Sequence, residues 1–242
     1  MSWEFTPDEF LHVWQETDLD RLPFPLQLRS SLAWRSDYEK LCWDLRTRMP
    51  PGFDPRLSAA LRAVAKPEMS LLLTGTRKQP VRIFAGTSEG YGATLVQRPG
   101  RTEEFGGNVV VEFGSPTVIP RVFASVLGKI PAGCHPALIE SLDTIELSLE
   151  SWTGTKETTT DRMRKLLSQP RIGMGHIEVR CGLHDPRPHP PQYLSWFDVE
   201  HDGRYTYRQH YSDFRIDPAS AESISAEITR MMRVQEGFSE SY

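Results

Sequence analysis

Histidine, cysteine and aspartate side chains gather in one short stretch of the second half, where they could bind zinc. The five residues are His176, Cys181, His184, Asp185 and His189. Zinc is held by thiolate and imidazole ligands at short spacings of this kind. His176 and Cys181 differ by five positions along an expected strand, so alternation directs them to opposite faces.

A zinc site would therefore combine Cys181, His184 and His189 with a fourth ligand from elsewhere, for which Cys134 and His135 are candidates. The alternative is a surface loop that carries a buried cysteine. We favour the loop, because the stretch holds a single Cys-x2-His pair and no second pair mirrors it.

A second pattern, Gly86-Thr87-Ser88-Glu89-Gly90, matches the G-x-S-x-G motif that exposes the nucleophilic serine of α/β hydrolases. That motif needs a strand, a sharp turn and then a helix. The residues that follow it, 91–96, have instead the pattern of another strand. We therefore favour a hairpin turn and keep a serine esterase or hydrolase that uses Ser88 as the alternative function.

Other signatures of chemistry are missing from the sequence. It contains no Walker A motif, no G-x-G-x-x-G, no H-E-x-x-H and no calcium loop, so neither a cofactor nor an enzymatic activity is expected. The proline-rich run 186–191 could adopt polyproline II, although a stiff loop between strands is the simpler interpretation.

Composition narrows the classes of protein that remain. The 242 residues include 28 Lys and Arg against 32 Asp and Glu, a net charge of −4, which disfavours a nucleic-acid binder. No apolar run approaches the roughly 20 residues needed to span a bilayer, so no membrane association is expected. The first residues lack a signal-peptide pattern, and three cysteines do not make a disulfide framework, so we expect a cytoplasmic protein.

The first half is expected to contain helices followed by strands. Capping residues and prolines predict helices that begin near Pro7, Asp37 and Pro55, with an extended segment at 26–34. Four short strands should follow and pair as an antiparallel meander, because their connections are too short for parallel crossovers. These strands are Glu68–Gly75, Pro80–Gly86, Tyr91–Gln97 and Asn108–Phe113; a helix through Val122 ends the half.

The second half repeats this order of elements. Alternating residues predict a strand at Thr144–Glu150, and a helix follows from Thr158. Further strands are expected at His176–Cys181, Tyr193–Val199, Arg204–His210 and Tyr211–Ile216, with Asp202-Gly203 as a hairpin turn. Asp217-Pro218 should begin the last helix, whose apolar stripe suits a core but would also suit a surface that receives an apolar helix.

The repeat of element order predicts an α+β fold. A central antiparallel β-sheet with helices packed on it would bury both halves, in a quasi-two-fold arrangement. We expect a single domain over residues 1–242, with a first half of about 1–135 and a second half of about 136–242.

The sequence resembles the EspG family, the cytosolic chaperones of type VII (ESX) secretion systems, along nearly the whole chain. The segments that carry the resemblance are Trp3–Phe10 with Trp14, Leu22–Leu26, Asp54–Leu61, Arg82–Gln97, Arg162–Ile177, Trp196–Asp198 and Asp202–Tyr205. The match rests on their order and spacing. The acidic, serine-rich tail and the loop 184–191 depart from the family pattern.

The resemblance implies a chaperone that binds the apolar helical tip of a PPE protein in a PE–PPE heterodimer, keeps it soluble and delivers it to the secretion machinery. When no PE–PPE heterodimer is bound, a homodimer of the chain is the alternative assembly. By position, the resemblance implies partner contacts at Arg29, Trp196, Arg204, Tyr205, Tyr207, Ile224, Ile228, Met231 and Met232. Tyr193 would add aromatic area to the same surface, although alternation lets only half of the strand residues face outward.

Overall fold

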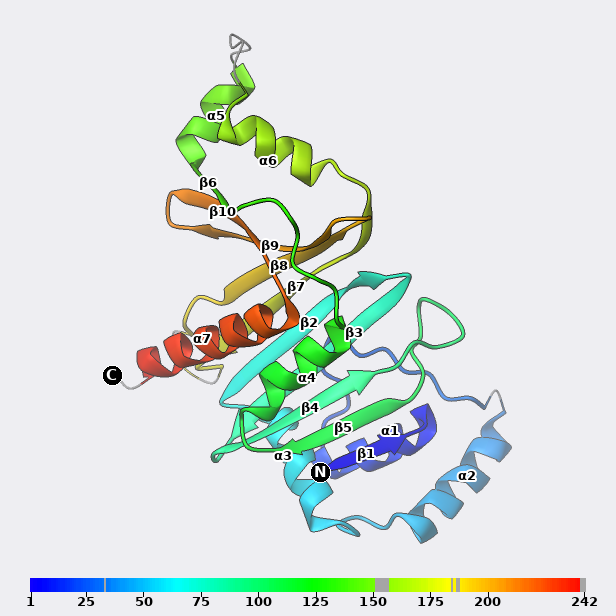
Figure 1. The fold of residues 1–242 in the computed structure, drawn as a ribbon. Coiled ribbons are helices and arrows are strands. Elements are labelled where there is room, and N and C mark those ends of the chain that lie inside the picture. Colours follow the sequence, from blue (N-terminus) through cyan, green and yellow to red (C-terminus); the bar gives the residue numbers. More distant parts are fainter. Residues whose placement is uncertain (33, 151–156, 184, 186–187, 240–242) are drawn as a thin grey trace.

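The computed structural model describes residues 1–32, 34–150, 157–183, 185 and 188–239. These residues form a single antiparallel sheet of ten strands in the order β1-β5-β4-β3-β2-β7-β8-β9-β10-β6 (Figure 1). The strands are β1 (Ser2–Phe5), β2 (Met69–Arg77), β3 (Gln79–Ser88), β4 (Tyr91–Gln97), β5 (Val109–Gly114), β6 (Leu138–Ser141), β7 (Arg171–Cys181), β8 (Gln192–Val199), β9 (Gly203–His210) and β10 (Asp213–Pro218).

Helices pack on both faces of this sheet. The helical elements are α1 (Pro7–Trp14), a short 3-10 turn η1 (Gln15–Thr17), α2 (Arg35–Arg48), α3 (Pro55–Ala65), α4 (Val118–Leu127), α5 (Leu142–Glu150), α6 (Thr159–Leu167) and α7 (Ala221–Ser239). Of these, α2 lies against α1 and adds none of its described residues to the cores on the sheet. Within the described residues, none of these helices is both long enough and apolar enough to cross a membrane.

Local chemistry explains where three of the helices begin. Thr6 caps α1 and Thr158 caps α6, each in a reciprocal pair with an acid three residues later. Asp54 accepts hydrogen bonds from the backbone of Arg56 and Leu57 at the start of α3, with Pro55 in the first turn. The helices predicted to begin near Pro7, Pro55 and Thr158 are confirmed.

The two halves are related by a pseudo-two-fold axis between β2 and β7. Each half consists of an edge strand, helices, four meandering strands and a final helix: β1 to α4 in the first half and β6 to α7 in the second. The strands run outward from the centre, β2 to β5 on one side and β7 to β10 on the other, and β1 and β6 close the two edges. The α+β fold and its quasi-two-fold order are confirmed.

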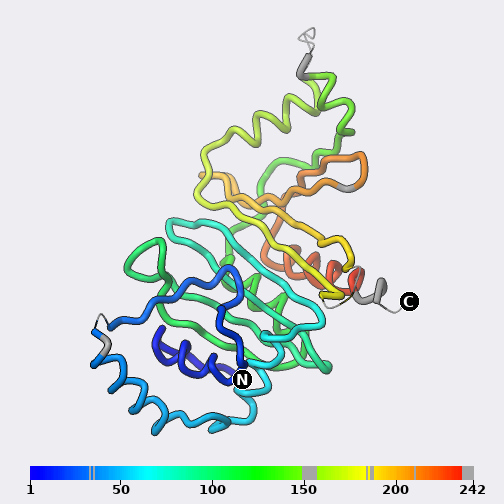
Figure 2. The backbone as a smooth tube through the Cα atoms, turned by 180° about the vertical axis from the view of Figure 1, so that it is seen from behind, coloured from blue at the N-terminus to red at the C-terminus, as the bar shows by residue number. Residues whose placement is uncertain are grey.

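The two faces of the sheet are covered differently. Helices α4 and α7 lie together over the central strands, where they bury Leu71, Leu73, Ile177 and Val179. On the opposite face, α1 and α3 cover β3 to β5, and α5 and α6 cover the strands near β10. The middle of that second face, between the two groups of helices, carries no helix among the described residues (Figure 2).

The predicted strand Thr144–Glu150 is wrong, because these residues belong to α5. The Ser141 hydroxyl accepts a hydrogen bond from the Thr144 backbone at 3.1 Å, which begins the helix. Ile145 and Ser148 are half-buried at helical spacing, whereas Leu147 is exposed. The strand of this region is β6, which precedes the helix.

Smaller differences concern element ends. Ser220 begins α7, since its side chain accepts from the Ser223 backbone, while Asp217 and Pro218 still belong to β10. Segment 26–34, expected to be extended, forms no strand among its described residues. The four strands predicted in the first half all form, each within a few residues of the expected bounds.

Candidate partner-binding surface

Most of the residues expected to contact a partner are buried in this chain. The side chains of Trp196, Arg204 and Tyr205 are completely enclosed, and those of Ile224, Ile228, Met231 and Met232 are nearly so. In this conformation none of the seven is open to a second protein. Only Arg29 and Tyr207 of the predicted set reach the surface.

Trp196 is buried because β2 and β7 leave room for its ring. Gly75 of β2 pairs with Gly175 of β7, and a Cβ added at Gly75 would lie 2.9 Å from the indole atom Cζ2. The guanidinium of Arg204 lies over the indole, 5.5 Å from the ring centroid. Trp196 therefore fills the space under α4 and α7 instead of facing outward.

Tyr205 is buried on the other face of the sheet. Its ring stacks on Phe197 at 5.4 Å, and its hydroxyl donates to Asp202 Oδ2 at 2.6 Å. Burial and the neighbouring Asp202 carboxylate both raise the pKa of the Tyr205 hydroxyl, so it remains protonated and acts as a donor. Its role is structural.

The apolar stripe of α7 belongs to the main core. Ile224, Ile228, Met231 and Met232 pack with α4 and the central strands in one cluster. Of the two interpretations of the stripe, the structure therefore supports a core and not a surface that receives an apolar helix. Helix α7 lies flat on the sheet and has its other side in solvent.

Arg29 and Tyr207 lie toward the face opposite to α4 and α7. Arg29 is exposed and its guanidinium lies 5.7 Å from the centre of the Phe105 ring. Tyr207 is half-buried beside Phe197 and Phe214, at centroid distances of 6.0 and 5.8 Å. Tyr207 pairs with Ser195 of β8 and so borders the uncovered part of the sheet.

The uncovered middle of this face forms what we call the exposed sheet strip. Its members share one side of β2, β7 and the start of β8, as shown by the pairs Thr74–His176, Thr76–Met174 and Glu178–Tyr193. The exposed residues of the strip are Thr76, Met174, His176, Arg180 and Tyr193. Of these, Met174 is 47% and Tyr193 51% exposed, so two large side chains on central strands are open to a partner.

The strip combines apolar, aromatic and polar groups. Glu178, at its centre, is buried and paired with Arg180. Tyr193 offers a rigid ring with a polar tip, and Met174 a flexible apolar chain. Leu72 and Ser195 lie half-buried on the same side. This mixture is typical of a protein-binding surface.

Ser88 does not lie on a nucleophile elbow. It ends β3 and pairs with Tyr91 at the start of β4, and the turn residues Glu89 and Gly90 both have positive φ, at 52° and 77°. This is the geometry of a two-residue hairpin turn. The element that follows is the strand β4 and not the helix that a nucleophile elbow needs, and the predicted hairpin is confirmed.

The zinc ligands considered from the sequence are not assembled as a group in the described residues. His176 is exposed on the strip, while Cys181 is buried on the α7 side, as alternation required. His184 lies outside the described residues, as do Pro186 and Arg187 of the proline-rich run.

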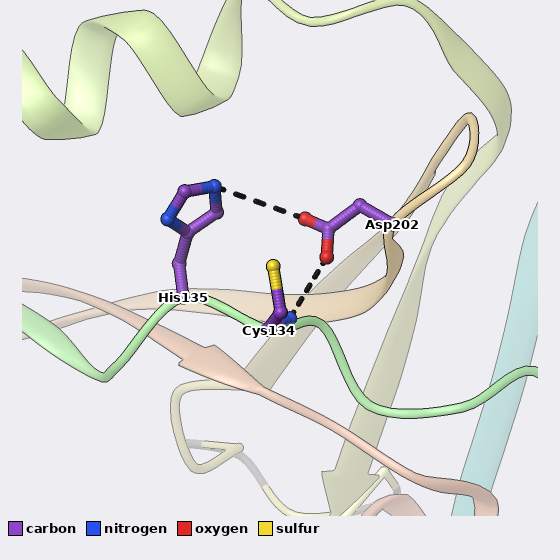
Figure 3. Close-up of side chains that lie close together, drawn as sticks. All are labelled: Cys134, His135 and Asp202. Atoms are coloured by element: carbon purple, nitrogen blue, oxygen red, sulfur yellow. Dashed lines mark hydrogen bonds and ion pairs between the residues drawn. The ribbon is translucent and has the colours of Figure 1, made fainter.

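A different group of ligand-type residues does converge, namely Cys134, His135 and Asp202 (Figure 3). The same three residue types could also suggest a cysteine nucleophile. The hydrogen bond with the Asp202 carboxylate raises the pKa of the Cys134 thiol, whereas a nucleophilic cysteine needs a lowered one. Sequence spacing could not reveal this group, because Asp202 is 68 residues from Cys134.

The structure thus defines a class: an α+β protein with a pseudo-two-fold sheet and one exposed central face. The EspG family model matches residues 6–230, and the chain belongs to this family, as the sequence resemblance implied. A search of curated proteins finds no match. Among solved structures, the chain is similar to the Mycobacterium tuberculosis type VII secretion system chaperone EspG5, solved in complex with a PE25-PPE41 dimer. The two chains are 11% identical, the match covers 96% of each, and the TM-score is 0.65, so this likeness shows a shared fold.

Proposed function

We propose that the chain is a type VII (ESX) secretion chaperone that binds a PE–PPE heterodimer. The observation that carries this proposal is family membership over residues 6–230. The similar fold of a chaperone that was solved with a PE–PPE dimer supports it. The protein would act in the cytoplasm, before its cargo reaches the secretion machinery.

The exposed sheet strip is the proposed docking surface. An apolar helical tip on a PPE protein would aggregate unless it is covered. Helices α1 and α3 on one side and α5 and α6 on the other flank a strip that carries Met174 and Tyr193, so a helical tip could lie along β2 and β7. Arg29 and Tyr207 would then contribute at the margins of the contact.

The proposed unit of function is the whole chain. The strip is formed by β2 from the first half and β7 and β8 from the second, and the pairing of β2 with β7 extends from Met69–Cys181 to Thr76–Met174. Neither half alone carries the complete strip, which supports a single domain over residues 1–242.

Co-expression with the PE–PPE pair encoded nearest its gene tests the proposal. We expect a complex of one copy of each protein to elute together in size-exclusion chromatography with light scattering. The free chain, measured alone, shows whether a homodimer exists and whether the partner replaces it. If the chain and the PE–PPE pair are both folded and elute separately, this pair is not a client; failure with all PE–PPE pairs of the genome would overturn the proposal.

The proposed action is binding without turnover. A fluorophosphonate probe that labels activated serines provides the test, with Ser88→Ala as the control. We expect equal, background labelling of both proteins, because Ser88 ends a strand before a hairpin turn and is not on a nucleophile elbow. Strong labelling that Ser88→Ala removes would contradict a purely binding role.

A further inference from the structure

Three side chains with metal-binding atoms meet beside the segment that links the first half of the sequence to the second. Cys134 and His135 lie on the segment between α4 and β6, and Asp202 lies in the turn between β8 and β9. One ligand atom from each lies within 4.8 Å of the other two. Figure 3 shows the thiol, the imidazole and the carboxylate directed toward a common point.

The carboxylate of Asp202 is already held in place. Its Oδ1 accepts from the Cys134 backbone at 2.8 Å, and its Oδ2 accepts from the Tyr205 hydroxyl at 2.6 Å. A carboxylate oxygen has more than one acceptor position, so each oxygen keeps a lone pair for a cation. Hydrogen bonds of this kind to a ligand orient it and increase metal affinity.

The segment that carries Cys134 and His135 is also fixed. The Arg204 backbone donates to Pro131 O at 2.8 Å, Gly133 donates to Arg204 O at 3.0 Å, and His135 donates to the Tyr205 hydroxyl at 3.0 Å. Gly133 is needed for this close approach, because a Cβ there would overlap the Tyr205 ring. The buried tyrosine therefore positions both parts of the cluster.

The ligand set selects the metal. Thiolate and imidazole favour zinc over magnesium or calcium, and three protein ligands with a water as the fourth is a common zinc arrangement. Tetrahedral zinc needs its nitrogen and oxygen ligands about 3.3 Å apart. His135 Nε2 and Asp202 Oδ2 are 4.0 Å apart, and the exposed imidazole can close this difference by a small rotation.

We propose that Cys134, His135 and Asp202 form a zinc site with three protein ligands and an open position for water. The site is distinct from the exposed sheet strip and does not depend on the proposed partner. Its ligands join the segment between the halves to the β8–β9 turn, so zinc would stabilise the folded chain.

Titration of the full, metal-free chain with Zn²⁺ in a calorimeter tests the site. We expect one Zn²⁺ per chain and a rise in the melting temperature when zinc is added. Cys134→Ser and His135→Gln should each weaken binding at least about tenfold, since loss of even a hydrogen-bond partner of a ligand costs 10–100-fold. With Co²⁺ as a probe, the thiolate-to-cobalt absorption band should form with the native chain and be missing in Cys134→Ser.

Two substitutions serve as matched controls. His201→Asn removes an exposed imidazole next to Asp202, and Cys42→Ser removes another accessible thiol; both should retain native zinc affinity. Because Cys134 and His135 are exposed, their variants should fold. Circular dichroism of each variant checks this. Native affinity in Cys134→Ser and His135→Gln, or no binding of one Zn²⁺ by the native chain, would overturn the proposal.

Discussion

Arg204 of β9 and Asp198 of β8 form an ion pair in which neither side chain is exposed to solvent. Nε of Arg204 lies 2.6 Å from Oδ1 of Asp198, and Nη2 lies 3.1 Å from Oδ2. The same guanidinium donates to Leu127 O at 2.7 Å, at the end of α4, and Asp198 is also paired with Arg77 of β2. The pair thus connects strands of both halves with the helix between them.

Asp198→Asn should strongly destabilise the fold. It removes the negative charge and leaves Arg204 buried without its counter-ion, which typically costs about 3–5 kcal/mol. Urea unfolding followed by circular dichroism measures the change. Asp217→Asn is the matched control, since the Arg215–Asp217 pair is part-exposed and should contribute no more than about 1 kcal/mol. A similar decrease in the free energy of unfolding in both variants would contradict a special role for the buried Arg204–Asp198 pair.

Gly75→Ala should loosen the junction of the halves. The added methyl group would overlap Met174 O and lie 2.9 Å from Trp196, so β2 and β7 must separate or the indole must move. Overpacking of this kind costs about 1–3 kcal/mol. Gly114→Ala, where a Cβ would have open space, is the control and should leave the free energy of unfolding nearly unchanged. An equal change in the free energy of unfolding for both variants would show that the close packing of Gly75 against Met174 and Trp196 is unimportant.

Sequence patterns located the central strands because those strands are long and have distinct turns. Asp202 and Glu89-Gly90 lie in the turns of two hairpins, and the strands on either side formed as expected, although Gly203 begins β9 and the β8–β9 turn consists of residues 200–202. The edge strands β1 and β6 have four residues each, too few for a periodic signal. Residues Thr144–Glu150 satisfy both strand and helix periods, and the Ser141 cap decides for the helix.

The partner surface was harder to predict, for a physical reason. Alternation separates Trp196 from Phe197 but cannot say which faces solvent, and here both are buried because helices cover both faces of β8 at that level. Tyr193, near the start of β8, is exposed because neither group of helices reaches it. Which part of a strand is covered depends on long-range packing that period-two patterning does not contain.

Glu227 should make stability depend on pH in the acid range. Burial alone would raise its pKa, but hydrogen bonds and charges from Arg230 and Arg208 outweigh burial and hold the pKa below the ordinary 4.5. A lowered folded-state pKa contributes stability above 4.5, and this contribution is lost as the pH falls below that value through the folded pKa. Glu227→Gln should therefore lose stability at pH 7 and show a shallower decline below pH 4.5, as measured by urea unfolding.

Arg230→Met provides a check on the cause. Because it removes the main favourable partner of Glu227, its stability should fall at pH 7 and change less than that of the native chain below pH 4.5. If all three proteins lose stability in parallel as the pH falls, the Glu227 cluster does not produce the dependence.

Tyr193→Ala should weaken binding of a PE–PPE heterodimer without weakening the fold. The side chain is half-exposed in the exposed sheet strip, and aromatic residues at the centre of an interface commonly contribute more than 1 kcal/mol, so the dissociation constant should rise about tenfold. Surface plasmon resonance measures the affinity and a thermal melt measures the fold. Tyr211→Ala, an exposed tyrosine in the β9–β10 turn outside the strip, should bind as the native chain does. Equal affinity of the native chain and Tyr193→Ala, or an equal loss in Tyr211→Ala, would place the partner elsewhere on the molecule.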